Sequence, residues 1–309
     1  MARWVVIGGT GYIGEALCLR LLADGQQVLS VSRAPRSPSG CEHFSLSLSP
    51  GGDYSSLFQS GDRVIYAAGL ASRAECTRHP VQAQWLNSDC PLELLRAADV
   101  AGAESFTYLS SVKALRPPRG VLANEDSGEP ATDSYGRSKW LGERQLLGGR
   151  WSCRVNVIRP ASVYGEAGGR AKSAGRAQRW RNLLGSLGRL SRFLPASGLR
   201  SFVHVGDLVE AICLLGQSAG CDRQVYIAAE PHFYDLASIA SALSGAQVRG
   251  SRGLTRLLLT PLRPLRRLAA VRSLLELEQS ELYSAARLRA ALSWQAKTRY
   301  SRYLQEARG

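Results

Sequence analysis

The chain has 309 residues, 45% of them hydrophobic, which is enough for a large domain with a full apolar core and a smaller companion. Its formal net charge is +14, and because residues 1–150 carry equal numbers of basic and acidic side chains, the whole excess lies beyond residue 150. No run of about 18 apolar residues appears and the N-terminus lacks a basic-then-apolar signal pattern, which argues against a membrane-spanning helix and a secretion signal.

The seven cysteines are scattered, odd in number and free of C-x-x-C pairs. This usage is typical of reduced thiols in a cytoplasmic protein, and we expect neither a disulfide framework nor a metal site. The basic excess has two interpretations: a solvated surface, or a surface that meets an anion such as a nucleotide diphosphate, a nucleic acid or a membrane. No recognisable nucleic-acid-binding module accompanies the charge, so nucleic acid is not an expected partner.

In chain order, the first half alternates short apolar strands with amphipathic helices, the pattern of a parallel sheet covered on both faces. We predict strands over 4–7, 27–31, 63–67, 106–109 and 154–159, and helices over 14–23, 91–100 and 135–147. The predicted fold class is α/β, a doubly wound parallel sheet with a smaller C-terminal domain. We place the dinucleotide-binding domain at 1–165 and the mainly substrate-binding part at 166–309, with elements around 200–215 returning to the first domain.

Beyond residue 165 the alternation loosens. We expect a Gly/Arg-rich loop over 165–176 and a strand over 202–205, and the stretch 249–272 carries seven arginines and no acid. Within it, segment 254–268 is basic and leucine-rich, which suits an anionic membrane surface. Pro261 and Pro264 interrupt any long helix there, which favours a place inside the smaller domain instead.

Gly8, Gly11 and Gly14 form a G-x-x-G-x-x-G run between the first predicted strand and helix, with Tyr12 and Ile13 inside it. Glycines at this spacing let the backbone approach a pyrophosphate, whose charge then lies at the helix N-terminus. The run therefore predicts a bound dinucleotide and a Rossmann-type sheet.

The residues that follow the second predicted strand indicate which dinucleotide is bound. An acidic residue there binds the ribose hydroxyls of NAD, whereas an arginine accommodates the 2′-phosphate of NADP. This chain has Ser32, Arg33 and Arg36 and no carboxylate at that point. Because a guanidinium pairs with phosphate through two parallel hydrogen bonds, NADP(H) is the preferred cofactor and NAD(H) stays open.

Tyr135 and Lys139 lie four residues apart on one predicted helix, so both can face one cleft. A tyrosine has a pKa of about 10 in water, and a neighbouring ammonium favours its phenolate and lowers that pKa. Ser111, just after a predicted strand, supplies a second hydroxyl to hold a substrate oxygen. The three residues predict hydride and proton transfer at a carbon that bears a hydroxyl or a carbonyl.

Together with Tyr66-Ala67-Ala68-Gly69, Asn87 and the runs 109–113, 159–165 and 200–208, these motifs resemble the extended short-chain dehydrogenase/reductase family. That family contains nucleotide-sugar epimerases, dehydratases and reductases, and the resemblance extends from residue 1 to about 215. It implies that Tyr135 is the catalytic acid/base and that Lys139 binds the nicotinamide ribose while lowering the pKa of the tyrosine. Ser111 fits the catalytic serine, with Ser110 as its neighbour.

The resemblance also assigns binding residues. For the cofactor they are Gly8, Gly11, Tyr12, Ile13, Gly14, Arg33, Ala67, Ala68, Gly69, Lys139 and Pro160. For the substrate, Arg200 matches the arginine that holds a sugar-nucleotide diphosphate, unless it forms a strand-edge salt bridge with a residue such as Asp207. Arg170, with Lys172, is a further candidate. Lys113 either lies at the rim of the cleft or contacts substrate phosphate or sugar oxygen.

Two departures from the family pattern narrow the activity. The dehydratases carry an Asp-Glu pair directly after the catalytic hydroxyl residue, and this chain has Val112-Lys113 there, which argues against dehydration. In place of an acidic residue near the adenine, the chain has Ser47-Leu48-Ser49, which leaves the adenine contacts open.

Arg33 in place of a carboxylate favours a reductase over an epimerase. The Ser110–Lys113 segment, followed by a proline-containing loop and the run Asp133–Lys139, looks most like the 4-keto-reductase branch of this family. Those enzymes use NADPH to reduce UDP-4-keto-6-deoxy-N-acetylhexosamines in bacterial surface-polysaccharide (O-antigen, lipopolysaccharide) synthesis. An NAD-dependent UDP-hexose 4-epimerase is the first alternative, and a non-catalytic NAD(P)-binding sensor or assembly protein is the second. The resemblance implies a UDP-sugar as partner; a homodimer is common in the family and stays open for this chain.

Overall fold

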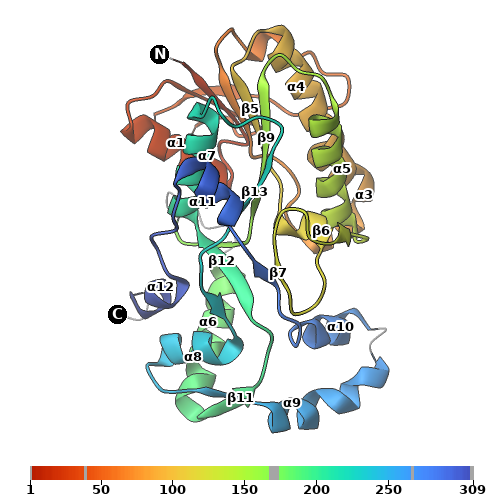
Figure 1. Ribbon diagram of the computed structural model, residues 1–309, viewed down its shortest axis with the longest axis vertical. Coiled ribbons are helices and arrows are strands. Elements are labelled where there is room, and N and C mark those ends of the chain that lie inside the picture. Colours follow the sequence, from red (N-terminus) through yellow and green to blue (C-terminus); the bar gives the residue numbers. More distant parts are fainter. Residues whose placement is uncertain (1, 38–39, 167–173, 266–267, 307–309) are drawn as a thin grey trace.

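The computed structural model of the protein describes residues 2–37, 40–166, 174–265 and 268–306. The upper half of the molecule in Figure 1 is built on one seven-stranded sheet of order β13-β9-β5-β4-β1-β2-β3, in which every neighbouring pair is parallel. This is the strand order of a dinucleotide-binding sheet with one further strand at an edge. The strands are β1 (Trp4–Ile7), β2 (Val28–Ser32), β3 (Glu42–Ser45), β4 (Arg63–Tyr66), β5 (Ser105–Leu109), β9 (Arg154–Pro160) and β13 (Val225–Ala228).

Helices cover both faces of this sheet, which confirms the predicted doubly wound α/β fold. One face packs against α1 (Tyr12–Ala23) and α7 (Val205–Gln217), the other against α4 (Cys90–Val100) and α5 (Ser134–Gly148). Strand β1 is buried along its whole length, and its alternate residues serve the two cores: Val6 belongs to the first and Val5 to the second. A strand buried on both faces needs a continuous apolar run, which is why β1 was readable from its sequence.

The predicted strands and helices of the first half all form, with ends shifted by one or two residues at most positions. Three features are not evident from the hydrophobic pattern. The edge strand β3 is mostly exposed, β13 lies far along the chain, and a short helical segment precedes α4. That segment consists of α2 (Arg73–Arg78), α3 (Pro80–Gln84) and a π-helical turn over Trp85–Asp89.

The lower half of Figure 1 begins with a three-stranded sheet of β10 (Ser162–Tyr164), β12 (Arg200–His204) and β14 (Phe233–Tyr234). Below it lies a part that we call the distal lobe, the described residues of 174–199 and 236–276. In it α6 packs on α8 and β11 pairs with β15. Its elements are α6 (Ala174–Leu190), β11 (Phe193–Pro195), α8 (Leu236–Ser244), β15 (Arg249–Ser251), α9 (Arg252–Leu259) and α10 (Ala269–Glu276).

The loop predicted over 165–176 is wrong at its end, because α6 already begins at Ala174. The strand predicted over 202–205 forms as β12, two residues earlier. As expected from its prolines, the stretch after α9 does not continue as an α-helix: Thr260–Leu265 is a 3₁₀ turn. A proline removes one backbone donor and clashes with the preceding turn, which ends α9 at Leu259.

Several elements beyond residue 165 return to the large sheet. They are α7, β13 and α11 (Ala286–Leu292), and α11 packs against the other two. The division into domains at residue 165 stays a prediction. Across the described ranges, no helix combines the length and apolar character needed to cross a bilayer, and all seven cysteine side chains are buried and free.

Candidate active site

The glycine run forms a tight loop between β1 and α1, held against the start of the loop that follows β4. At Gly8 the backbone has φ +90°, and a Cβ there would lie 2.7 Å from the Ala68 nitrogen. A Cβ on Gly14 would lie 2.2 Å from the Gly8 carbonyl oxygen. No side chain caps the N-terminus of α1, whose N-cap residue is Gly11. The first amides of the helix are therefore left to an anion.

Tyr12 ties this loop to the far side of the cleft, since its hydroxyl donates a hydrogen bond of 2.8 Å to the Gly165 carbonyl. Gly69, at φ +141°, closes the other side: a Cβ there would lie 2.3 Å from Asn87 Oδ1 and 3.4 Å from Lys139 Nζ. Pro160 ends β9, beside β13, and is buried. The structure thus brings the predicted cofactor residues of three motifs to the carboxyl ends of the strands, where α/β sheets bind nucleotides.

Arg33 lies directly after β2 and is exposed. The loop that carries it is held by β3, because one ring nitrogen of His43 (Nε2) lies 2.7 Å from the Ala34 carbonyl and the other lies 3.2 Å from the Ser30 hydroxyl. Among the described residues, no acidic side chain forms an ion pair with Arg33. His43 was not singled out from the sequence, and only the pairing of β2 with β3 reveals its place.

Ser111 and Tyr135 meet because two backbone segments pack very closely. Ser111 starts a 3₁₀ turn over Val112–Ala114, and its hydroxyl accepts a hydrogen bond from the Lys113 amide at 3.2 Å. Helix α5 begins beside this turn, with Asp133 as its N-cap. A Cβ on Gly136 would lie 2.2 Å from the Lys113 carbonyl oxygen. Glycine at this position therefore lets the first turn of α5 bring Tyr135 to Ser111.

The pKa of Tyr135 is raised, not lowered as the Tyr–Lys spacing predicts. Burial is the larger cause, and a hydrogen bond between the Ser111 and Tyr135 side chains acts in the opposite direction. Burial disfavours the phenolate because its charge loses water. Tyr135 therefore holds its proton at neutral pH, and Ser111 is the neighbour that most favours releasing it.

Lys139 lies one turn further along α5 and is fully enclosed. Its Nζ donates a hydrogen bond of 2.8 Å to the Leu109 carbonyl and lies 4.8 Å from the centre of the Tyr108 ring. Burial lowers its pKa to about 8, with Glu143 opposing the shift. The lysine is thus held at the end of β5 by the backbone and by an aromatic face, in a place where a small pH change alters its charge.

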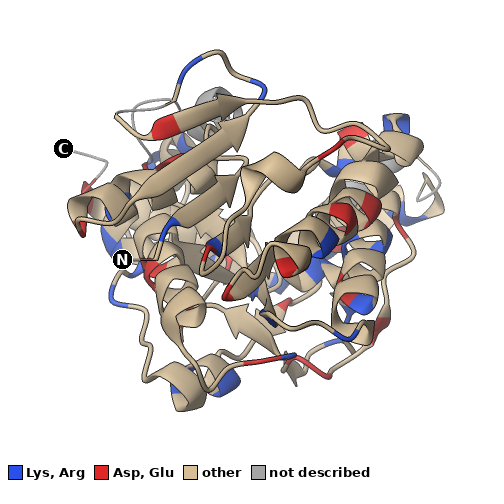
Figure 2. Ribbon diagram, turned by 90° about the horizontal axis from the view of Figure 1, so that it is seen from above, with Lys and Arg blue, Asp and Glu red and all other residues tan. Residues whose placement is uncertain are grey.

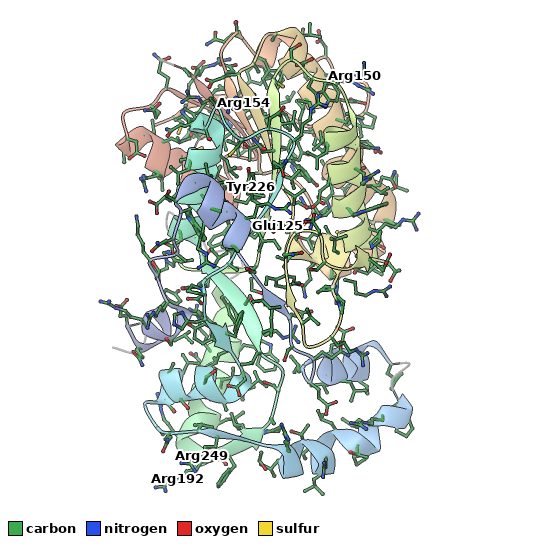
Figure 3. All side chains as sticks on the ribbon, in the orientation of Figure 1. Glu125, Arg150, Arg154, Arg192, Tyr226 and Arg249 are labelled. Carbon is green, nitrogen blue, oxygen red and sulfur yellow. The ribbon has the colours of Figure 1, made fainter. Side chains whose placement is uncertain are left out.

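A buried ion pair supports this arrangement from below. Glu143 follows Lys139 by one more turn of α5 and accepts two hydrogen bonds from Arg159 of β9, at 2.8 and 2.5 Å. Glu143 also accepts a hydrogen bond from the Ser110 hydroxyl. The third guanidinium nitrogen of Arg159 donates to the Glu125 carbonyl at 2.7 Å, near the centre of the molecule in Figure 3. Ser110 therefore has a structural partner, which leaves Ser111 as the serine that faces Tyr135.

The two cations predicted to bind substrate lie side by side, with one carboxylate between them. Glu281 Oε2 is 2.5 Å from Lys113 Nζ and 2.5 Å from an Arg200 guanidinium nitrogen. Burial raises the pKa of Glu281, but the charges of Lys113 and Arg200 outweigh that effect, so the net pKa is lowered. The partner of Arg200 is thus Glu281 rather than Asp207, whose carboxylate accepts from the Thr298 amide at 3.0 Å.

Arg73 is a further cation near Tyr135, and the sequence patterns did not indicate it. Arg73, at the start of α2, lies 3.5 Å from the Asp133 carboxylate and 3.4 Å from that of Glu276 at the end of α10. It favours the phenolate of Tyr135 as a minor contributor to that pKa. No motif marks Arg73, Glu276 or Glu281, because their partners are far away in the chain. Arg170 and Lys172, the other candidates, lie outside the described residues.

The glycine loop fits a dinucleotide. Its uncapped helix and the space that a Cβ would fill at Gly8, Gly14 and Gly69 are the features that a pyrophosphate and a flat ring require. The residues that would hold the cofactor are the glycine loop, the Ala67–Gly69 turn, Pro160 and Lys139. A nicotinamide dinucleotide, when bound, supplies hydride transfer.

Comparisons with known proteins agree with this geometry. Residues 4–228 match the family model described as the NAD dependent epimerase/dehydratase family. The UDP-glucose 4-epimerase of Rhizobium meliloti (strain 1021) is 26% identical over 236 residues, which cover 67% of this chain and 70% of the relative. The dTDP-6-deoxy-L-talose 4-dehydrogenase (NAD(P)(+)) of Kitasatospora kifunensis is 30% identical over 241 residues, covering 72% and 71%.

Solved structures share the fold. The UDP-Glc/GlcNAc 4-epimerase of Campylobacter jejuni superposes with a TM-score of 0.73 at 16% identity, covering 100% of this chain and 98% of the other. MoeE5, solved in complex with UDP-glucose and NAD, gives a TM-score of 0.71 at 19% identity, covering 98% and 96%. With its strand order, glycine loop and Ser–Tyr–Lys set, the chain belongs to the NAD-dependent epimerase/dehydratase family of extended short-chain dehydrogenases/reductases, whose members are NAD(P)-dependent oxidoreductases and epimerases.

Proposed function

We propose that the protein is an NADPH-dependent reductase of the 4-keto group of a UDP-4-keto-6-deoxy-N-acetylhexosamine, working in the cytoplasm in bacterial surface-polysaccharide synthesis. The observation that carries the proposal is Arg33, exposed directly after β2 where an NAD-specific sheet has a carboxylate. A reductase takes up NADPH once in each turnover, whereas an epimerase returns the hydride to its own tightly held NAD. Selection of NADP(H) therefore favours the reductase.

The proton in this reaction comes from Tyr135. As the carbonyl carbon gains hydride, its oxygen becomes an alkoxide, and Tyr135 donates its proton to that oxygen, which completes the alcohol. Burial raises the pKa of Tyr135, so the residue carries its proton when the reaction starts, and the hydrogen bond from Ser111 opposes this shift and favours release of the proton. Ser111 donates a hydrogen bond to the same oxygen. Lys139, with its pKa lowered to about 8, would bind the ribose and pass a proton to Tyr135, and the lysine would regain that proton from water.

The diphosphate of the sugar nucleotide would bind Lys113 and Arg200. These two cations come from distant segments of the chain, and both form an ion pair with Glu281. The place of that carboxylate between them is one that a phosphate group could also take. Phosphate oxygens accept from arginine and lysine as carboxylate oxygens do. Two proteins that share the fold, MoeE5 and the UDP-glucose 4-epimerase of Thermotoga maritima, were solved with UDP-glucose, which supports a UDP-sugar as the substrate class here.

The test uses the purified protein with UDP-4-keto-6-deoxy-GlcNAc and NADPH, followed by loss of NADPH absorbance and by identification of the C4 alcohol. We expect one NADPH consumed for each sugar reduced, and NADPH preferred over NADH. Absence of NADPH oxidation, together with NAD that copurifies and interconversion of C4 epimers of a UDP-hexose, would establish the epimerase instead.

That second candidate has support of its own, since several relatives are named UDP-glucose or UDP-arabinose 4-epimerases. Arg33 separates the two candidates. In Arg33→Asp we expect the affinity for NADPH to fall roughly tenfold to a hundredfold, the value of a charge-assisted hydrogen bond to phosphate, while NADH binding holds. Arg150→Asp, at another exposed arginine, is the matched control. Equal loss of NADPH and NADH binding in Arg33→Asp would remove the basis for NADP(H) selection.

A further inference from the structure

Apart from Glu276 at its last position, the distal lobe contains no acidic residue. Neither 167–206 nor 236–275 has an Asp or a Glu, while both are rich in arginine. The pairing of β11 with β15 and the contact of α9 with β11 bring these segments together at the lower end of Figure 1. Arg192 and Arg249 mark this end in Figure 3, far from the large sheet.

Most of the arginines at this end form no ion pair with the described part of the chain. Within the described ranges, six arginines of this end are exposed and five of them take part in no ion pair: Arg189, Arg192, Arg249, Arg252 and Arg256. Only Arg263, itself exposed, has a partner, Glu278 at 3.7 Å. A shallow hollow of about 340 Å³ is lined by three of these arginines, Arg252, Arg256 and Arg263, and by one carboxylate, Glu278, so its lining carries an excess of positive charge.

Large apolar side chains are exposed among these arginines. Leu257 on α9 is 70% exposed and Leu190 at the end of α6 is 84% exposed. Their exposed neighbours at the same end are Phe193, Leu258, Leu265 and Leu268. Scattered exposed leucines are ordinary, but a set gathered at one end of the molecule marks an interaction surface.

The opposite end of the molecule is different. Figure 2, which views the sheet end, shows acidic and basic positions interspersed along the helices there. The first 150 residues are balanced in charge. The arginine-rich, leucine-bearing surface is therefore a property of the distal lobe and not of the protein as a whole.

We propose that the distal lobe docks on the surface of an anionic phospholipid bilayer. The exposed leucines and Phe193 enter the boundary between headgroups and acyl chains, and the surrounding arginines bind lipid phosphates. Segments with one apolar side and one cationic side lie in the interface in this way, and each Lys or Arg near an anionic surface adds to the binding. The contact is peripheral.

Charge decides between this occupant and two others. A second copy of the chain that presented the same surface would bring arginines against arginines, which is repulsive. A nucleic acid would satisfy the arginines but would leave Leu190, Leu257 and Phe193 without an apolar partner. Of these three, a lipid surface alone offers both anionic groups and an apolar layer to the same patch. The proposal does not rest on the reductase activity, because Lys113, Arg200 and Tyr135 are not part of this surface.

The test is cosedimentation of the purified protein with vesicles of phosphatidylcholine alone or of phosphatidylcholine with phosphatidylglycerol. We expect binding only to the anionic vesicles, and weaker binding at high salt because free ions screen the attraction. Two double variants probe the two parts of the surface. Arg252→Glu with Arg256→Glu should weaken binding by at least roughly twentyfold, about fivefold for each arginine removed. Leu257→Ser with Leu258→Ser should weaken it on the order of tenfold.

Matched controls lie in the part of the molecule built on the seven-stranded sheet and the helices that cover it, which we call the sheet region. Arg96→Glu with Arg150→Glu changes charge equally at exposed arginines, and Val81→Ser with Val100→Ser removes apolar side chains that are 83% and 90% exposed. Circular dichroism and enzyme activity in vesicle-free solution confirm that each variant is folded. No binding to phosphatidylglycerol vesicles, or equal losses in the controls, overturns the proposal. So does full binding by the leucine variant with displacement by duplex DNA, which is the behaviour of a general polyanion site.

Discussion

In the sheet region, Arg159 is buried and its guanidinium binds Glu143 at 2.5 and 2.8 Å, whereas in the distal lobe Arg256 lies exposed and forms no ion pair with any described residue. The two arginines differ because one is buried and the other is exposed to water. A buried charge without a partner is very costly, and each guanidinium nitrogen of Arg159 and each carboxylate oxygen of Glu143 has a hydrogen-bond partner inside the protein. An exposed arginine keeps its water and has no such need.

The two regions therefore use their charged side chains differently. In the sheet region the charges fix one arrangement: Glu143 binds Ser110 and Arg159 and, through its charge, acts on Lys139 one turn away. This holds Lys139 and Tyr135 on one side of the cleft. In the distal lobe most of the exposed arginines form no ion pair with any described residue. The Lys113–Glu281–Arg200 cluster lies between these cases, internally paired yet partly exposed.

The largest effect that separates the regions is on chemistry. Tyr135→Phe removes the proton donor and keeps the ring, so the turnover number should fall on the order of 10² to 10⁴-fold. Steady-state reduction of the keto sugar by NADPH measures it. NADPH binding, followed by fluorescence, should be unchanged, because the glycine loop is remote from the hydroxyl. If biological activity persisted in Tyr135→Phe, the non-catalytic sensor or assembly role would replace the enzyme.

The next effect compares two ion pairs. Arg159→Met leaves Glu143 buried without its partner, and we expect the free energy of unfolding to drop by about 3–5 kcal/mol. Arg263→Gln breaks the largely exposed pair with Glu278 in the distal lobe and should cost less than about 1 kcal/mol. Urea unfolding of both variants beside the wild type gives the two values. Similar losses in the two variants would contradict the division between a self-partnered sheet region and an outward-facing lobe.

A somewhat smaller effect concerns Lys139 and pH. Its pKa is lowered from 10.5 to about 8 by burial, so between these values the unfolded chain binds more protons than the folded one. Stability of the wild type should therefore rise as the pH is raised from about 8 to 10.5, by at most about 3 kcal/mol. Lys139→Met should lack this rise.

The difference between the two unfolding curves isolates Lys139, because all other titrating groups are shared. Lys139→Met also leaves the Leu109 carbonyl without its donor, a loss of about 1 kcal/mol that does not depend on pH. Parallel curves for the two proteins would mean that folding does not lower the pKa of Lys139.

Local patterns explain why much of the sheet region was predictable. The glycine run, the apolar strand β1 and the Tyr–Lys spacing each lie within a few residues, and their meaning follows from backbone geometry and helix periodicity. The roles of the site residues stay predictions until the variants are measured. What the spacing could not give was the direction of the Tyr135 pKa, because that depends on how deeply Gly136 lets α5 pack against the Lys113 backbone.

Long-range contacts explain what was missed. Glu281 is 168 residues from Lys113 in the chain, and nothing near either residue announces their contact. Arg73 likewise meets Glu276 across 203 residues. The edge strand β3 lacks an apolar run because most of its residues are exposed, so its register with β2, which places His43 under the Arg33 loop, appears only in three dimensions.

The smallest effect tests the region between the two. If Lys113 and Arg200 bind the diphosphate, Glu281 competes with it for the same cations. Glu281→Gln keeps the shape and removes the charge, so KM for the sugar nucleotide should fall roughly fivefold, the value of one partly exposed charge pair, while kcat holds. KM should also become more sensitive to salt, because two cations would then lack an internal counter-charge. Glu278→Gln, at the Arg263 pair, is the matched control and should change neither constant.

A rise of KM in Glu281→Gln would mean that the carboxylate holds the two side chains in place instead of competing for them. Unchanged kinetics would remove Lys113 and Arg200 from the diphosphate site. The change in KM therefore decides whether the Lys113–Glu281–Arg200 cluster resembles the distal lobe or the sheet region. A competing carboxylate makes it a surface kept ready for an external anion, like the distal lobe, whereas a positioning carboxylate makes it part of the internally partnered frame that holds Tyr135.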